Sequence, residues 1–290
     1  MEGKVNKSMD MDDFDKDKLE WLKNEIINIE EYFLEHGFNI SSWYGNIGEN
    51  KYYDKLSKLN KGYKYKPLLD KYDDKYPSFL VWEIYSVWFG VKFKAGDKVL
   101  DLGGACSLFS FFLAVHGVSV IAIDKNKQLV DESNKIAKVL NLPYLAICDD
   151  IEDYMLDCKE KFDVITSICV FEHLEQEKRK RIICSIHKIL SKNGKVAITF
   201  DYRNPSKFVN INSPQDVIDL FGCSSHLSLA GDGNFYDNKK NYLVHPFFHK
   251  SFFIKYKLRS IKKGNFRKRD FFKIKFKDDY SFAVVFLEVK

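Results

Sequence analysis

The sequence has no long hydrophobic run and begins with a polar segment. None of its apolar stretches reaches the roughly 18 residues that a membrane-spanning helix requires. Residues 1–20 are rich in acids and lack the basic start and apolar centre of a secretory signal. These two absences predict a cytoplasmic protein that is neither exported nor anchored by a membrane span.

The sequence also lacks the usual spacing of metal-binding and disulfide-forming cysteines. None of its six cysteines forms a Cys-x-x-Cys pair, so we expect reduced, buried, structural thiols. His245 and His249 are close enough in sequence to share a metal, but no acid or cysteine lies beside them, and we predict no metal. The six cysteines are Cys106, Cys148, Cys158, Cys169, Cys184 and Cys223.

An excess of positive charge is absent outside one segment near the C-terminus. The 290-residue chain has a net charge of +5, but residues 250–277 hold 12 Lys/Arg and one acid, a local charge of +11. The remainder of the chain therefore carries −6. Such a segment attracts phosphates, nucleic acid or an anionic membrane surface, or forms a solvated lysine-rich hairpin, and composition leaves these alternatives open.

Apolar patterning divides the chain into two parts. Residues 1–95 read as a helical, aromatic-rich extension that could cover a site as a lid. From residue 96, short apolar strands alternate with amphipathic helices, which predicts an α/β fold with a doubly wound parallel sheet. Residues 202–268 form an insert, with a capped helix expected at 213–221, and two alternating runs, 271–276 and 281–289, predict a C-terminal antiparallel hairpin. A helix is expected over 176–191, ended by Asn193-Gly194.

Two acids stand at the ends of the first two strands of this alternation. The strand that ends in Asp101 is followed by Gly103, Gly104 and Ala105, and the next strand ends in Asp124. A dinucleotide-binding turn has a third glycine, which is missing here, and Asp101 would repel a pyrophosphate. S-adenosylmethionine has no phosphate and carries a sulfonium and an ammonium, so it tolerates acids at this position.

The segment Val99–Ser107 resembles the first motif of class I S-adenosylmethionine-dependent methyltransferases. That motif reads acid-x-Gly-x-Gly-x-Gly, and this chain keeps Gly103 but has Ala105 and Ser107 at the later glycine positions. The resemblance covers residues 96–201 well and 270–289 weakly. It implies a Rossmann-like, seven-stranded methyltransferase sheet, with S-adenosyl-L-methionine as the cofactor and a small-molecule acceptor.

The resemblance also implies which residues bind the cofactor. Asp101 would hold the ammonium group, Asp124 both ribose hydroxyls, and an acid after the third strand the adenine amino group. Asp150 is the first choice for that acid because Ile151 follows it directly, and Asp149 is nearly as good. The full expected set is Asp101, Gly103, Gly104, Ala105, Asp124, Lys125, Asp149, Asp150, Ile151 and Ile168.

Methyl transfer to a hydroxyl group requires a base close to the acceptor. Glu172 and His173 follow the fourth strand, at the edge where acceptors bind, and His173 is the first candidate base because imidazole titrates near neutral pH. Asp201, which ends the fifth strand beside Tyr202, is the second candidate.

The acceptor class can be narrowed but not identified. The chain has neither the Pro-Pro-aromatic motif of amino-methylating nucleic-acid enzymes after the fourth strand nor a Pro-Cys pair of cytosine enzymes. We therefore expect transfer to a small-molecule hydroxyl, as in the tailoring of glycans or secondary metabolites. Two alternatives stay open: an RNA or protein methyltransferase that uses residues 250–277, and a methyltransferase-like binding protein without catalytic activity.

Overall fold

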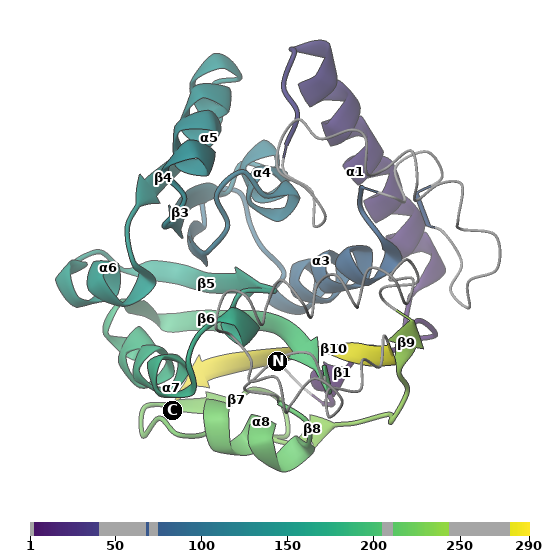
Figure 1. Cartoon of the computed structure of the whole chain (residues 1–290), viewed down its shortest axis with the longest axis vertical. Helices are drawn as coiled ribbons and strands as arrows, with labels where there is room; N and C mark the ends of the chain where they lie inside the picture. Colours follow the sequence, from purple (N-terminus) through teal and green to yellow (C-terminus); the bar gives the residue numbers. More distant parts are fainter. Residues whose placement is uncertain (1–2, 41–67, 70–74, 205–210, 244–278) are drawn as a thin grey trace, which may run out of the picture.

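The structure is a computed structural model that describes residues 3–40, 68–69, 75–204, 211–243 and 279–290 (Figure 1). The strands are β1 (Asn6–Ser8), β2 (Lys98–Leu102), β3 (Ser119–Asp124), β4 (Tyr144–Cys148), β5 (Phe162–Ile168), β6 (Leu190–Tyr202), β7 (Leu227–Leu229), β8 (Phe235–Tyr236), β9 (Tyr242–Leu243) and β10 (Asp279–Val289). The α-helices are α1 (Lys16–Glu35), α3 (Ser78–Val91), α4 (Leu108–Val115), α5 (Lys127–Val139), α6 (Ile151–Asp157), α7 (Gln176–Ser185) and α8 (Pro214–Phe221). Two 3₁₀ turns, η2 (Phe171–His173) and η3 (Ile186–Lys188), flank α7.

The centre of the molecule is a mostly parallel sheet. Strands β4, β3, β2, β5 and β6 pair in parallel in that order, and β10 pairs antiparallel with β6 over eight registered residues. Beyond β10, two short strands from distant parts of the sequence, β1 and β7, pair antiparallel with it. The predicted Rossmann-like parallel sheet, with its antiparallel strand at the C-terminal end, is therefore confirmed.

Helices cover both faces of this sheet and create two cores. Helices α1, α3, α4 and α5 pack on one face, and α6, α7 and α8 on the other (Figure 1). Successive side chains of β10 point to opposite faces of the sheet and so contribute to both cores. Val284 belongs to the first core and its neighbour Val285 to the second. The seven α-helices thus build a three-layer α/β/α arrangement within the described part of the chain.

The N-terminal extension contributes to the sheet itself and not only to a helical cover. Strand β1 lies between β10 and β8, and α3 packs on β10 and β6. The side chain of Asn6 is fully buried: its amide donates to the carbonyl of Ala230 at 2.8 Å and its oxygen accepts from the Phe286 amide at 2.7 Å. One side chain therefore joins the N-terminus, the insert and the C-terminal strand.

Replacing Asn6 with alanine is expected to lower the free energy of unfolding by about 2–3 kcal/mol, because a buried N–H and a buried C=O lose their partners. Chemical denaturation followed by circular dichroism measures this change. Lys7→Ala is the matched control on the same strand, since Lys7 makes an exposed ion pair with Asp13 and its loss should cost under about 1 kcal/mol. Equal destabilisation by both variants would contradict the role assigned to Asn6.

One sequence expectation about secondary structure needs correction. The helix expected over 176–191 ends at Ser185, and β6 begins already at Leu190 and runs through Asn193-Gly194. The pairing of β5 with β6 shifts register between Phe162 and Val164, which pair with Leu190 and Lys195. The extra residues of β6 at this irregularity include Asn193 and Gly194, so the strand continues through them. The capped helix of the insert is confirmed, since the Ser213 side chain and Asp216 form a capping box at the start of α8. The expected hairpin arm 271–276 lies outside the described residues.

The expectation that the cysteines are buried is wrong for most of them. All six are free thiols, but only Cys106 is buried, whereas Cys148, Cys184 and Cys223 are exposed. Apolar neighbours in the sequence misled this prediction, because Cys148 and Cys184 occupy exposed positions of elements that bury few residues: Ala146 alone in β4, and Arg179, Ile182 and Ile183 in α7. Among the described residues, no helix has the length and hydropathy of a membrane span.

Candidate functional site

The strand-end acids lie on three adjacent strands, as the sequence predicts. Strand β2 pairs with β3 up to Leu102 and Ile123, and β3 pairs with β4 up to Asp124 and Cys148. The contact between β2 and β3 continues into the turn after β2, because the Gly103 amide donates to the carbonyl oxygen of Ile123 at 2.7 Å. The acids at the ends of β2 and β3 and those directly after β4 therefore share one edge of the sheet.

The turn after β2 depends on its two glycines for different reasons. Gly103 has φ +82°, and an added Cβ would lie 2.5 Å from the side chain of Val170. Gly104 covers the carboxylate of Asp101, where a Cβ would lie 1.8 Å from Oδ2. Ala105 and Ser107 replace glycine without strain, because neither has a positive φ, and Ser107 caps α4 by accepting from the Ser110 amide.

Asp101 lies under this turn and is almost completely buried, with 1% of its surface exposed. Its carboxylate accepts hydrogen bonds from the hydroxyls of Ser110 and Thr166, the latter at 2.8 Å. Burial raises the pKa of Asp101 to about 6, although the two hydroxyls oppose the change. The group therefore exchanges its proton close to neutral pH, where an arriving cation would favour the charged form.

Asp124 remains partly accessible at the end of β3. One carboxylate oxygen accepts from the Asn126 amide at 2.8 Å. Partial burial raises its pKa above the ordinary value, and the backbone amides of Asn126, Ala105 and Lys125 oppose the rise. A carboxylate held in this way by its own turn is oriented before any ligand arrives.

The two acids after β4 differ in their surroundings. Asp150 caps α6 and accepts from Lys178, and it forms an ion pair with Lys125. Burial raises the pKa of Asp150, but the hydrogen bonds from Lys125 and Lys178 outweigh burial and hold it well below the usual range. Asp149 instead accepts a hydrogen bond from the Asp150 amide at 2.8 Å. Structural partners thus occupy Asp150 far more than Asp149.

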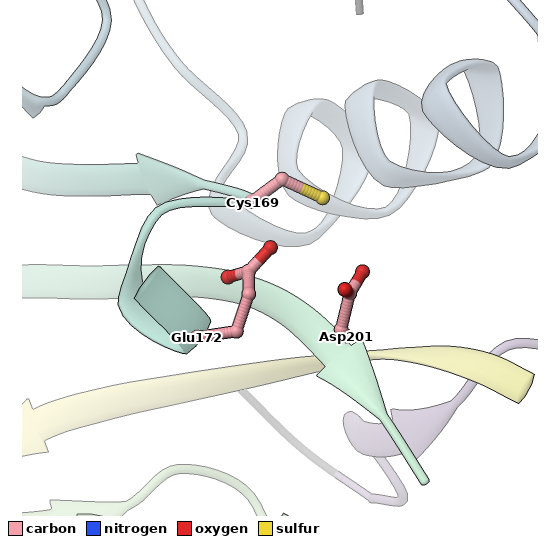
Figure 2. Close-up of side chains that lie close together, drawn as sticks. All are labelled: Cys169, Glu172 and Asp201. Carbon is pink, nitrogen blue, oxygen red and sulfur yellow. The ribbon is translucent and has the colours of Figure 1, made fainter. Parts of the chain in front are cut away.

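The candidate acceptor residues gather at the ends of β5 and β6. Figure 2 shows Glu172 in the turn after β5 and Asp201 near the end of β6, with both carboxylates extending toward the side on which Cys169 lies. Glu172 and Asp201 are each 6% exposed. His173 lies 3.8 Å from Glu172 but turns outward, with 62% of its side chain exposed. The structure brings the two acids together and leaves the histidine at the surface.

Sequence reasoning missed Glu83 of α3, which lies at the same edge. It is fully buried, and its Oε1 accepts a hydrogen bond from the Cys169 thiol at 2.9 Å. Burial raises the pKa of Glu83 to about 8. Its signal was available, because Glu83 is the sole charged residue in the apolar sequence of α3. A lone acid within such a helix indicates a buried polar partner.

The remaining predicted residues occupy supporting positions. Ile151 is buried in the first turn of α6, and Ile168 is half-buried at the end of β5. Val170 links the two halves of the site, since it packs on Gly103 and lies two residues before Glu172. His245, His249 and the basic segment 250–277 lie outside the described residues.

Sequence comparison finds a family match over the first half of the sheet. Residues 99–194 match a family described as methyltransferase domain. Among curated proteins, the ubiquinone biosynthesis O-methyltransferase of Coxiella burnetii (strain RSA 493 / Nine Mile phase I) is 31% identical over 109 residues, which are 38% of this chain and 45% of that protein. The protein of the same name from Pseudomonas syringae pv. tomato is 27% identical over 117 residues, 40% of this chain and 49% of that one. The chain thus spans about half the length of the curated relatives that it matches.

Structural comparison extends the similarity beyond the matched segment. The crystal structure of TehB from Haemophilus influenzae superposes with a TM-score of 0.50 at 17% identity, covering 76% of this chain and 66% of that one. At this identity the likeness concerns the fold. The family match itself runs from β2 into β6 and includes the strand-end acids and the turn with Glu172.

Proposed function

We propose that this chain, which contains a class I S-adenosylmethionine-dependent methyltransferase domain, transfers the methyl group to a hydroxyl group of a small molecule. S-adenosylmethionine is the cofactor of this domain, and the strand-end acids are the residues that we assign to it. The pair of buried acids at the neighbouring edge, Glu172 and Asp201, is the observation that carries the proposal.

The cofactor would lie across the ends of β2, β3 and β4. Asp101, under the Gly103–Gly104 turn, attracts the ammonium group, and Asp124 accepts both ribose hydroxyls. Asp149 accepts from the adenine amino group, because Lys125 and Lys178 already occupy Asp150. Ala105 and Ile151 offer apolar surface beside the turn and the adenine ring.

The acceptor would lie beyond Val170, over the ends of β5 and β6. Glu172 and Asp201 hold its hydroxyl group in line with the methyl carbon, which is the positioning that a displacement requires. The acceptor oxygen attacks the methyl carbon, the C–S bond breaks, and the electron pair of that bond stays on sulfur as S-adenosylhomocysteine. His173 takes the hydroxyl proton and, being exposed, releases it to water.

A small acceptor is favoured by the relatives and by the missing motifs. Both curated relatives are named for O-methylation in the biosynthesis of ubiquinone, which is a small molecule. The sequence also lacks the motifs of nucleic-acid methyltransferases after β5. These points support oxygen as the accepting atom and leave the structure of the acceptor open to experiment.

Release of S-adenosylhomocysteine in the presence of candidate acceptors tests this proposal. The full chain is incubated with S-adenosylmethionine and either a panel of hydroxylated small molecules or RNA, at low and high salt. We expect acceptor-dependent release with a small molecule and little effect of salt. Release that depends on RNA and falls steeply with salt would contradict the proposal and support a polymer acceptor bound by residues 250–277.

Asp149→Ala is expected to weaken binding of S-adenosylmethionine about tenfold, the worth of one hydrogen bond to the adenine. Asp150→Ala should instead lower stability by about 1 kcal/mol through the lost helix cap, with little change in affinity. Calorimetry and thermal unfolding of both variants separate the two effects. The reverse ranking would make Asp150, the first choice from the sequence, the adenine ligand.

Cofactor binding is expected to weaken as the pH falls through 6, because Asp101 takes up a proton near that pH and loses its attraction for the ammonium group. Between pH 7.5 and pH 5 the dissociation constant should rise about tenfold, since at pH 5 about one molecule in ten keeps this carboxylate charged. Titrations at both pH values measure the change. In Asp101→Asn the pH dependence should disappear, and an unaltered dependence in that variant would place the titrating group elsewhere.

A further inference from the structure

Three potential metal ligands meet at the ends of β5 and β6, and a fourth lies beside them on α3. The Cys169 thiol and the carboxylates of Glu172 and Asp201 offer ligand atoms that all lie within 4.8 Å of one another. Figure 2 shows the three side chains converging from different elements. The fourth group is Glu83, whose carboxylate contacts the sulfur of Cys169 at 2.9 Å.

Glu83 provides an independent sign that a ligand belongs here. It has no exposed surface, and its Oε2 has no well-aligned hydrogen bond among the described residues, although the Thr199 side chain lies beside the carboxylate. Burying a polar oxygen without a partner is costly, and native structures rarely leave such an atom unsatisfied. Since Oε1 of the same carboxylate touches Cys169, the unsatisfied oxygen lies beside the cluster and would gain a partner from a bound cation.

The spacing and chemistry of the cluster fit a divalent ion. Oxygen ligands at about 2.0–2.4 Å from a metal lie at most about 4.8 Å apart, and Cys169, Glu172 and Asp201 meet this limit before any rearrangement. Glu83 contacts Cys169 and would have to shift toward the two other carboxylates to join them. Three carboxylates offset the charge of a divalent cation, and a sulfur ligand favours a transition metal over Mg²⁺ or Ca²⁺. Asn204 supports the arrangement by donating to Asp201 at 2.7 Å.

We propose that Glu83, Cys169, Glu172 and Asp201 bind one divalent transition-metal cation. The site joins the N-terminal extension, through α3, to the end of the sheet where the acceptor would lie. If the proposed methyl transfer is correct, this cation also binds the acceptor oxygen and lowers the pKa of its hydroxyl group, a role that rests on the proposed function. Binding of the cation itself does not depend on that activity.

Cobalt titration of the full chain tests the proposal without cofactor or acceptor. After treatment with chelator and its removal, Co²⁺ is added and absorption is followed, because cobalt bound to a thiolate has an intense charge-transfer band. The titration uses a Cys184→Ser background, since the sulfurs of Cys184 and Cys223 lie 3.3 Å apart and could bind cobalt themselves. We expect one Co²⁺ per chain with the thiolate band.

Substitutions of the ligands identify the site. Glu172→Gln and Asp201→Asn should each weaken binding at least about tenfold, and Cys169→Ser should abolish the charge-transfer band. Glu177→Gln, an exposed acid on α7, is the control that should bind normally. Circular dichroism verifies folding, and calorimetry with S-adenosylmethionine on the same samples shows whether the cofactor site is intact.

A folded chain that binds the cofactor but shows no thiolate–cobalt band would overturn the cation site and leave the proposed function standing. Cobalt binding that survives the combined Glu172→Gln and Asp201→Asn substitutions would overturn it as well. Cobalt binding without any methyl transfer would support the site and count against the proposed function alone.

Discussion

Asp124→Ala is expected to weaken binding of S-adenosylmethionine about 100-fold, or about 3 kcal/mol, because two hydrogen bonds from the ribose hydroxyls to a charged group are lost. The carboxylate stands at the end of β3, partly accessible and oriented by the Asn126 amide at 2.8 Å. Little rearrangement is needed for it to accept a diol, so most of its interaction energy contributes to affinity. Isothermal titration calorimetry of the variant against the unaltered chain measures the loss.

Two further variants make this result specific. Asp124→Asn keeps an acceptor for the Asn126 amide but removes the charge, so an intermediate loss of about tenfold is expected. Asp131→Ala removes an exposed acid on α5 that pairs with Lys127, and it should leave affinity unchanged. Unaltered affinity in Asp124→Ala would remove the basis for the cofactor assignment at this edge.

Gly103→Ala is expected to lower the free energy of unfolding by about 3 kcal/mol and to weaken cofactor binding by at least about tenfold. The positive φ of +82° is strained for alanine, and the new methyl group would lie 2.5 Å from Val170. To relieve the overlap between this methyl group and Val170, either the turn over Asp101 or the segment that leads from Val170 to Glu172 has to move. Denaturation and calorimetry on the same preparation measure both losses.

The clash and the backbone strain can be separated within this chain. Gly96 has a similar φ of +89°, but a Cβ there would meet nothing within 4 Å. Gly96→Ala should therefore cost about 1 kcal/mol and leave cofactor binding unchanged. Adding Val170→Ala to Gly103→Ala should recover affinity by removing the clash. If Gly96→Ala and Gly103→Ala behave alike, contact with Val170 is not what makes Gly103 necessary.

The positions of the strand-end acids that we assign to the cofactor could be predicted from the sequence, because they depend on a local pattern. An apolar strand that ends in an acid places that acid at the carboxyl edge, and parallel pairing then brings Asp101 and Asp124 to adjacent strands. Our preference for Asp149 over Asp150 rests on a contact that the sequence does not show. Lys178, which donates to Asp150, lies on α7, 28 residues away in the sequence.

The acceptor half was only partly predictable because its residues come from distant segments. Glu172 and Asp201 were identified from their places after two strands, but Glu83 reaches them from α3 through the packing of the N-terminal extension on the sheet. Composition suggested a separate helical cover for residues 1–95. No periodic pattern shows that Asn6 will join β10, since that contact is made between residues 280 positions apart.

Calorimetric titration of the unaltered full chain with S-adenosylmethionine tests the central claim most directly. The account predicts one binding site per chain, with a heat signal that disappears when the chain is first saturated with S-adenosylhomocysteine and persists in the presence of a nicotinamide dinucleotide. A folded chain that gives no such signal, or that binds the dinucleotide in its place, would contradict the account.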